Sequence, residues 1–393
     1  MGLDAARLPT GIAYKMDCFI VGPLLVLLTY PFIIYPALLA VLARYCPYPR
    51  KATEPGDEPP TVAMAVCALN EQEVIRDKIE NCLALTYRKD KLSLVFVSDG
   101  SEDKTAEIIR PYVSEGIELV ERETRIGKPA NLNRVLQDRT EDIFVLSDAN
   151  VLYEPDALDR LVERFADPSV GAVSGRVFLT DTTQRLDQAE KHYYSLEWKL
   201  QSRAAEFYSM AGADGAMYAV RREMFRACPD DTLIDDFVIA VGVVRSGKRV
   251  VFEPAAIGWE KGPSSLKEEF RRKVRIAAGA AQSVLRGNGL PFGSTARMWF
   301  VFLSHKLLRW LSPFLLALTI LVAALTWWCP LSITTLMAVV LLLAAAALKL
   351  VFGLSHPLIN AAFYFVFAQV STGLGLVKGI AGTQSVLWEK ANR

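Results

Sequence analysis

The chain has 393 residues, enough for two or three domains at the usual size of roughly 100–200 residues each. Its formal net charge of +1 at pH 7 excludes a nucleic-acid partner that is bound through bulk positive charge. Hydrophobic residues make up 52% of the chain, which is high for a soluble enzyme and typical of a globular domain that carries membrane spans.

The first predicted element is a membrane helix over residues 19–42, which hold no charged side chain and can cross about 30 Å of hydrocarbon. Prolines recur within it and no signal-peptide cleavage site is evident, so we expect a kinked helix. Basic residues are more frequent after the span than before it, which predicts that the downstream side is cytoplasmic. We assign residues 1–46 to this segment and residues 47–60, rich in Pro, Gly, Asp and Glu, to a linker.

An α/β domain is predicted over residues 61–290, where short apolar strands alternate with polar helices. The expected strands are 61–68, 92–98, 117–121, 143–147, 171–180 and 250–253. The expected helices are 71–85, 104–114, 130–138 and 186–207. This pattern indicates a mainly parallel sheet with helices on both faces.

The C-terminal part returns to membrane-like composition. Residues 291–311 mix aromatic and basic side chains, as in an amphipathic helix that lies in the bilayer interface. Residues 312–393 hold three candidate spans, at 312–328, 331–348 and 358–377. One span before the domain and three after it would leave the C-terminus outside, whereas its basic residues favour the inside. Either the charge of the C-terminal tail is too weak to decide on which side of the membrane the tail lies, or one apolar stretch is re-entrant or interfacial.

The six cysteines form no C-x-x-C pair, and several lie in apolar runs. We interpret them as free thiols, which predicts that the soluble part faces a reducing compartment.

Acidic and amide side chains follow the predicted strands. Asp148 ends the strand at 143–147, and ligands of parallel sheets bind beyond the carboxyl ends of the strands. An oxygen ligand there suits Mg²⁺ or Mn²⁺, with Asn150 two residues on. Asn70, Glu71 and Asp99 follow two other strands. Helix capping and turn formation are the alternative roles for these residues.

A basic turn opens the third predicted helix. Arg125, Gly127 and Lys128 bring two cations and backbone N–H groups to a helix start, where they could meet an anionic diphosphate. A solvated basic turn is the alternative. Further along, Gly212, Asp214 and Gly215 form a small-residue turn that lets the backbone approach a ligand closely.

Two charged pairs complete the set. Asp235 and Asp236 precede an apolar helix, where they either cap the helix or supply one residue that organises the site and one that removes a proton. Arg272 and Arg275 share a helix face and could hold a departing phosphate or, alternatively, lipid headgroups.

These motifs, in this order and between membrane spans, resemble family 2 of the inverting glycosyltransferases. The resemblance covers residues 61–281 and is to the membrane-integrated branch that includes cellulose, hyaluronan, chitin-oligosaccharide and poly-N-acetylglucosamine synthases. It implies a GT-A-type, Rossmann-like fold.

The resemblance also implies roles for individual residues. Asp99 would contact the uridine, and Asp148 would belong to the D-x-D element that binds the metal and the sugar nucleotide. Asp236 would be the base of the T-E-D motif, with Asp235 in place of Glu. Arg272 and Arg275 take the first and fourth places of Q-x-x-R-W.

Two departures from the family pattern matter. Asn150 replaces the second Asp of D-x-D, and Ile276 stands where the synthases carry the Trp that shapes the acceptor site. The second departure bears on processive elongation more than on sugar transfer.

We therefore predict a membrane-embedded hexosyltransferase of EC 2.4 type, in the cell (inner) membrane with its catalytic domain facing the cytoplasm. It would move a sugar from a UDP-sugar to a growing β-linked polysaccharide, in a reaction coupled to export of that chain, with Mg²⁺ or Mn²⁺ as cofactor. The alternatives are transfer of a single sugar to a lipid-linked acceptor, or a module that only binds nucleotide sugars. The lipid bilayer is an expected partner, and a homo-oligomer or an accessory subunit is compatible with the sequence.

The predicted site is a cleft beneath the bilayer. The predicted catalytic residues are Asp236 and Asp235. The nucleotide-sugar residues are Asn70, Glu71, Asp99, Lys128, Asp148, Arg272 and Arg275. Gly212, Asp214 and Gly215 would bind the acceptor, and Asp148 and Asn150 would hold the metal.

Overall fold

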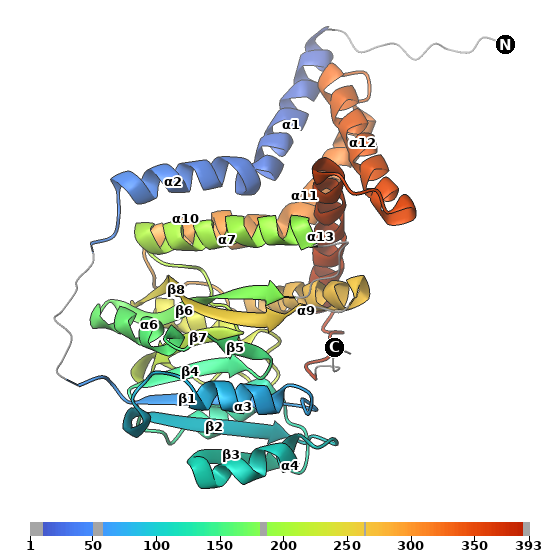
Figure 1. Ribbon diagram of the computed structural model, residues 1–393. Helices are drawn as coiled ribbons and strands as arrows, with labels where there is room; N and C mark the ends of the chain where they lie inside the picture. Colours follow the sequence, from blue (N-terminus) through green and yellow to red (C-terminus); the bar gives the residue numbers. More distant parts are fainter. Residues whose placement is uncertain (1–10, 50–57, 181–186, 263–264, 388–393) are drawn as a thin grey trace.

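The computed structural model describes residues 11–49, 58–180, 187–262 and 265–387, which form an α/β domain and a set of long apolar helices (Figure 1). The strands are β1 Val62–Ala68, β2 Leu92–Asp99, β3 Ile117–Arg122, β4 Ile143–Asp148, β5 Val151–Tyr153, β6 Val170–Thr180, β7 Met217–Arg221 and β8 Arg249–Lys261. The helices of the α/β domain are α3 Ile75–Leu83, α4 Thr105–Ile109, α5 Lys128–Leu136, α6 Ala157–Glu163, α7 Asp187–Phe207, α8 Asp235–Arg245 and α9 Leu266–Leu285. The apolar helices are α1 Gly11–Thr29, α2 Tyr35–Tyr45, α10 Ala296–Val301, α11 Leu308–Leu325, α12 Pro330–Phe352 and α13 Pro357–Ile380.

The eight strands form one mixed, mainly parallel sheet in the order β3-β2-β1-β4-β7-β6-β8-β5. Strands β3, β2, β1 and β4 run parallel, β7 runs antiparallel to β4 and to β6, and β5 runs antiparallel to β8. This confirms the predicted GT-A-type fold class. The carboxyl ends of the parallel strands and the start of β7 consequently meet at one edge of the sheet.

The core of the domain lies on both faces of this sheet. Strands β1 and β4 in its middle are buried along almost their whole length. Helix α5 packs on β1 and β2, and α8 packs on β6 and β8. Coverage of both faces explains why these strands are continuous apolar runs and why they could be predicted from the sequence.

Three features of the sheet differ from the prediction. Strands β5 and β7 were not expected, because both are short and follow turns of small or polar residues. Strand β8 was expected only at 250–253, since Pro254 and Gly258 interrupt its apolar run. It continues past a register shift relative to β6, where Ser174 pairs with Phe252 and Arg176 pairs with Ile257.

The N-terminal apolar segment is bent, as its prolines predict. A π-helical turn at Tyr30–Ile34, which contains Pro31, separates α1 from α2. Helix α2 packs along α7 at the top of the α/β domain, whereas α1 turns away with α11 and α12 (Figure 1). The predicted linker falls largely on residues 50–57, which lie outside the described residues.

The C-terminal helices have a similar bend. A second π-helical turn, Phe302–Leu307, joins α10 to α11. Helix α10 lies beside α7, where Arg297 donates to the backbone carbonyl of Phe207 at 3.2 Å. Among the described residues, four stretches are long and apolar enough to cross a membrane: Phe19–Tyr45, Ala296–Leu325, Pro330–Phe352 and Pro357–Ile380.

The cysteines follow the predicted pattern only in part. Cys46, Cys67, Cys82 and Cys228 are free thiols. Cys329, between α11 and α12, is disulfide-bonded, which corrects the expectation for that residue. This position lies in the apolar helices and not in the α/β domain, so the two groups of cysteines need not face the same compartment.

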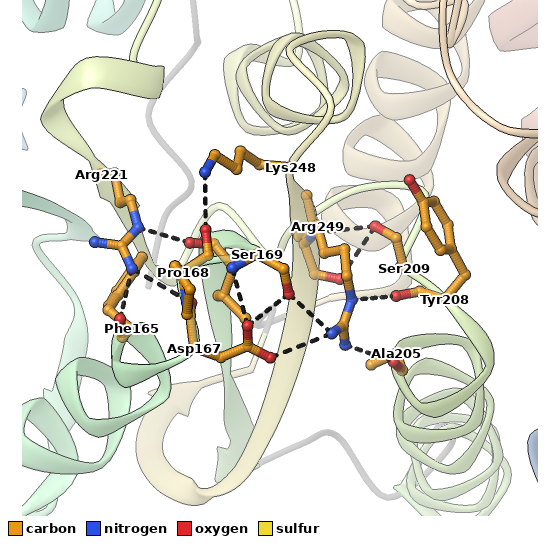
Figure 2. A network of polar contacts seen from close by, with 12 residues as sticks. Phe165, Asp167, Pro168, Ser169, Ala205, Tyr208, Ser209, Arg221, Lys248 and Arg249 are labelled. Carbon is orange, nitrogen blue, oxygen red and sulfur yellow. Dashed lines mark hydrogen bonds and ion pairs between the residues drawn. The ribbon is translucent and has the colours of Figure 1, made fainter. Parts of the chain in front are cut away.

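A polar network fixes the end of the sheet opposite the strand ends described above (Figure 2). The buried guanidinium of Arg249 donates to the carbonyls of Ala205 and Tyr208 at the end of α7, and it pairs with Asp167 at 3.4 Å. Arg221 donates to the carbonyls of Phe165 and Val170 nearby. The network joins α7 to β6 and β8. We therefore assign its charged groups to stabilising the fold and not to the functional site.

Candidate active site

Two loops at the carboxyl ends of β1 and β2 are tied to each other. Asn70 has a left-handed backbone (φ 55°), and its side-chain oxygen accepts from the N–H of Glu102 at 2.8 Å. The N–H groups of Asn70 and Glu71 donate to the hydroxyls of Ser101 and Thr105. Asn70 therefore organises this loop pair, and nucleotide binding by Asn70 and Glu71 stays a prediction.

Asp99 ends β2 and organises the basic turn. Its two carboxylate oxygens accept from the N–H groups of Ile126 and Gly127, each at 2.8 Å. Gly100 (φ 66°) leaves room for this approach, since a Cβ there would lie 2.6 Å from the nitrogen of Arg125. The contact of Asp99 with uridine stays a prediction, and its position near the start of α5 is established.

Lys128 and Asp148 form the centre of the site. The ammonium of Lys128 lies 2.6 Å from Oδ1 of Asp148 and 3.2 Å from the carbonyl oxygen of Gly215. Burial lowers the pKa of Lys128, but the carboxylates of Asp148 and Asp235 outweigh it and raise that pKa above its ordinary value. The lysine thus stays charged, and it links the end of β4 to the turn before β7.

Asp235 and Asp236 begin α8, and neither is the N-cap, because that position is occupied by Ile234. Asp235 is buried, and its Oδ2 has no hydrogen-bond partner among the described residues. Burial, and then the neighbouring charge of Asp235, raise the pKa of Asp236 to about 7. A carboxyl group with that pKa is suited to general-base catalysis near neutral pH.

The small-residue turn lies between these acids and the membrane-side helices. Oδ1 of Asp214 accepts from the N–H of Ala216 at 3.1 Å, which shapes the turn. A Cβ at Gly212 would meet the ring of Phe237 at 3.2 Å and the Nζ of Lys306 at 3.8 Å. Lys306 belongs to the π-helical turn before α11, so an apolar helix reaches the predicted acceptor turn directly.

Arg272 and Arg275 both lie on α9, but they have different hydrogen-bond partners. Arg272 makes two hydrogen bonds, at 2.8 and 3.0 Å, to the buried carboxylate of Glu269. Arg275 donates to the backbone carbonyls of Ser385 and Val386, at 3.2 and 3.0 Å, in the segment that follows α13. The guanidinium of Arg272 is therefore held within α9, and that of Arg275 is held by the segment after α13.

Both arginines are electrostatically linked to the acids. Burial raises the pKa of Asp214, and the charge of Arg272 opposes that rise. Burial lowers the pKa of Arg275, and the charge of Asp235 opposes that decrease. Arg272 is thus linked to Asp214 and Arg275 to Asp235, and the joint action of the two arginines on a diphosphate stays a prediction.

Glu260 and Lys78 are candidate site residues that the sequence analysis missed. Asn150 donates to Oε1 of Glu260 on β8 at 2.8 Å. Burial, and then the Asp148 carboxylate, raise the pKa of Glu260. A predicted last strand that continued beyond residue 253 would have included Glu260 and pointed to it. Lys78 lies on the polar helix α3, and no sequence pattern distinguishes it from a surface lysine.

The donor set fits a divalent cation that is shared with substrate phosphates. The side chain of Asp148 is 40% exposed and already faces a cation, the ammonium of Lys128, and Asn150 adds an amide group two residues on. Among the described residues, no group of three or more His, Cys, Asp or Glu side chains could hold a metal by itself. Phosphate oxygens and water would have to supply the other ligands, as is usual for Mg²⁺.

Comparison with known proteins shows the family of this chain. A family described as "Glycosyltransferase like family 2" matches residues 59–279. The probable glycosyltransferase YdaM of Bacillus subtilis (strain 168) is 28% identical over 241 residues, 58% of this chain and 57% of that protein. The poly-beta-1,6-N-acetyl-D-glucosamine synthase of Staphylococcus aureus (strain COL) is 26% identical over 239 residues, with the same coverage. The chain thus matches little more than half the length of these relatives.

A solved structure matches nearly the whole chain. It is the mannosyltransferase PcManGT of Pyrobaculum calidifontis, in complex with GDP-Man and Mn²⁺. The TM-score is 0.74 and the sequence identity is 22%, and the alignment covers 94% of this chain and 100% of that one. This likeness establishes a shared fold, including the apolar helices.

Proposed function

Since this chain belongs to the family 2 glycosyltransferases, we propose that it transfers a sugar from a UDP-sugar to a growing β-linked polysaccharide at a membrane. Glycosyl transfer (EC 2.4) follows from family membership. What we propose beyond family membership is the identity of the donor, the identity of the acceptor and the roles of the individual residues. The observation that carries it is the group formed by Lys128, Asp148, Gly215 and Asp236.

Asp236 is the proposed base. Inverting transfer needs an acceptor hydroxyl whose oxygen attacks the anomeric carbon as the bond to the diphosphate breaks on the opposite face. A hydroxyl is a poor nucleophile at neutral pH, so a carboxylate must take its proton as the new bond forms. The pKa of Asp236, about 7, supports this assignment, and Asp235 would keep that pKa raised.

The cations would stabilise the departing UDP. Lys128, Arg272 and Arg275 are fixed by protein contacts before substrate binds, and fixed positive charges offset the negative charge that develops on the diphosphate. Mg²⁺ or Mn²⁺ held by Asp148 and Asn150 would neutralise part of the same charge when bound. Asp99 would hold the basic turn in place and contact the uridine.

We propose that the α/β domain, residues 61–290, faces the cytoplasm, where nucleotide sugars are made. The free thiols of Cys67, Cys82 and Cys228 in this domain support a reducing surrounding. Cys329, between α11 and α12 and outside the α/β domain, is disulfide-bonded, which suits an oxidising side. Helices α2 and α10 would lie in the interface above the domain.

Transfer of one sugar to a lipid acceptor is the second candidate. Two observations favour it: Ile276 is 43% exposed at the position where the synthases carry Trp, and Lys306 reaches Gly212 from an apolar helix. A cation at that place suits an acceptor that enters from the bilayer surface.

Product analysis separates these functions. Membranes that contain the protein would be incubated with radiolabelled UDP-sugars, and the product would be sized and extracted. High-molecular-weight product supports the polysaccharide proposal, whereas a single organic-extractable glycolipid supports the second candidate. If neither fraction carries label although UDP still binds, both candidate functions are contradicted. The chain would then be a module that only binds nucleotide sugars.

A further inference from the structure

Lys78 is a charged residue in the protein core that the reaction described above does not use. It lies on α3, and its side chain is fully buried. Its ammonium donates to Oγ of Ser147 at 2.8 Å and to the carbonyl oxygen of Val151 at 2.6 Å. The same nitrogen lies 4.2 Å from the ring centroid of Tyr153. Lysine is almost never fully buried unless its charge is compensated, so these contacts need an explanation.

The two acceptors of Lys78 stand on either side of the proposed metal-binding turn. Ser147 precedes Asp148, and Val151 follows Asn150. One ammonium group therefore contacts both ends of the turn and leaves the side chains of Asp148 and Asn150 to other partners.

The turn is also held from the side of β8. Val151 pairs with Glu260, and the Glu260 carboxylate accepts from the side chain of Asn150. Loss of Lys78 would leave this second attachment in place. Asp148 would also stay held by Lys128 and by its own N–H, which donates to the carbonyl of Ala216. What would be lost is the ammonium that contacts both Ser147 and Val151, and with it the tie between the Asp148 end and the Asn150 end of the turn.

We propose that Lys78 is a positioning residue that holds Asp148 and Asn150 in the geometry needed to bind a divalent cation together with the donor diphosphate. This inference rests on the proposed function, because it takes the turn to be the metal site. Lys78 touches neither ligand, and it acts through Ser147 and Val151. It thereby has the role of an outer-shell partner, whose loss typically lowers metal affinity by roughly 10–100-fold.

Asn81 provides a matched control on the same helix. Its side chain donates to the carbonyl of Tyr153 at 2.7 Å and accepts from the N–H of Tyr153 at 2.8 Å. It thus anchors β5 to α3 as Lys78 does, but at the end of β5 away from the turn. A purely structural role for Lys78 predicts the same phenotype for both residues.

The test measures Mn²⁺ binding to the purified full-length protein in the presence of UDP, by electron paramagnetic resonance of free Mn²⁺, together with the melting temperature. Lys78→Met keeps the length of the side chain without its charge, and Asn81→Leu removes the control contact. We expect both variants to melt at lower temperature, but only Lys78→Met to weaken Mn²⁺ binding, by roughly 10-fold or more.

Each outcome either supports or overturns the positioning role of Lys78. Equal Mn²⁺ affinity in wild type and Lys78→Met, or equal losses in both variants, overturns the positioning role. If wild type itself binds no Mn²⁺ with UDP, the proposed metal site fails and this inference fails with it, whereas sugar transfer is decided separately by the product analysis described above. Should Lys78→Met not fold, Ser147→Ala removes one acceptor and keeps the ammonium, and unchanged Mn²⁺ affinity in that variant overturns the inference.

Discussion

The carboxylate of Asp236 rests directly against the backbone of Gly215. A Cβ at Gly215 would lie 3.0 Å from Oδ2 and 3.1 Å from Cγ of Asp236, closer than side chains normally pack. The carbonyl of the same glycine accepts from Lys128. One residue therefore separates the proposed base from the cation that neutralises Asp148, and it must be small.

Gly215→Ala should displace the base by a few tenths of an ångström and lower kcat by about 10-fold, because catalysis depends steeply on the position of the reacting groups. Donor KM should change little, since the contacts of Lys128 remain. Gly242→Ala in α8 is the control, because apart from its chain neighbours and the backbone of its own helix no atom lies within 4 Å of a Cβ there. A wild-type kcat for Gly215→Ala would contradict the packing described above.

Asp236→Asn should strongly slow transfer and leave UDP binding intact, because the amide cannot accept the hydroxyl proton. We expect a loss in kcat of roughly 10²–10⁴-fold, the usual contribution of a general base. Steady-state kinetics and calorimetric titration with UDP measure the two effects. The control is Asp231→Asn, which removes only a surface ion pair with Arg286. Normal turnover of Asp236→Asn would exclude it as the base.

The rate of transfer should depend on pH through Asp236. Its pKa is about 7, so below pH 7 the carboxyl group is protonated and cannot accept a proton. The logarithm of kcat should rise with a slope of about one up to about pH 7 and then level off. A profile that is flat between pH 5 and 8, measured with saturating donor, would contradict this role.

Ionisation of Asp236 as the pH rises should lower thermal stability, although it raises the rate of transfer. The pKa of Asp236 is higher in the folded chain than its ordinary value, so the folded state holds the proton more tightly. Its stabilising contribution is present at low pH and is lost as pH rises through about 7. Asp236→Asn should therefore raise the melting temperature at pH 8 and leave it nearly unchanged at pH 4. Equal shifts at both pH values would indicate that the pKa is not raised.

Strand positions could be predicted where burial leaves a clear pattern. Strands β1 and β4 are covered on both faces, and their predicted ends agree with the structure within a residue. The strand ends in turn located Asp99 and Asp148 correctly. The antiparallel strand β7 has no such signal, since it is five residues long and its place is set by pairing with β4 and β6.

Long-range partners could not be predicted. Lys78 lies in a polar helix and looks like a solvent-facing residue in the sequence, although the structure buries it against the turn proposed to bind the metal. No local pattern indicates that Arg275 donates to backbone carbonyls more than 100 residues away. Such contacts depend on how α9 and α13 pack, and no local pattern records that packing.

Two glycines bring α13 against the helix that carries Arg272 and Arg275. A Cβ at Gly375 would lie 2.4 Å from the carbonyl oxygen of Val274, and one at Gly379 would lie 2.3 Å from that of Ala278. Close backbone approach at small residues is a common way for apolar helices to associate. The position of α9, and with it the position of both arginines, therefore depends on α13.

Gly379→Leu should push α13 away from α9 and weaken donor binding, because Arg272 and Arg275 move with α9 while Lys128 and Asp148 do not. We expect donor KM to rise by about 10-fold, equivalent to about 1.4 kcal/mol of lost binding, with a smaller change in kcat. Val377→Leu enlarges a side chain on the same helix that is 52% exposed, and it should leave KM unchanged. Equal KM values for wild type and Gly379→Leu, in a protein that melts at the normal temperature, would show that α9 holds its arginines independently of α13.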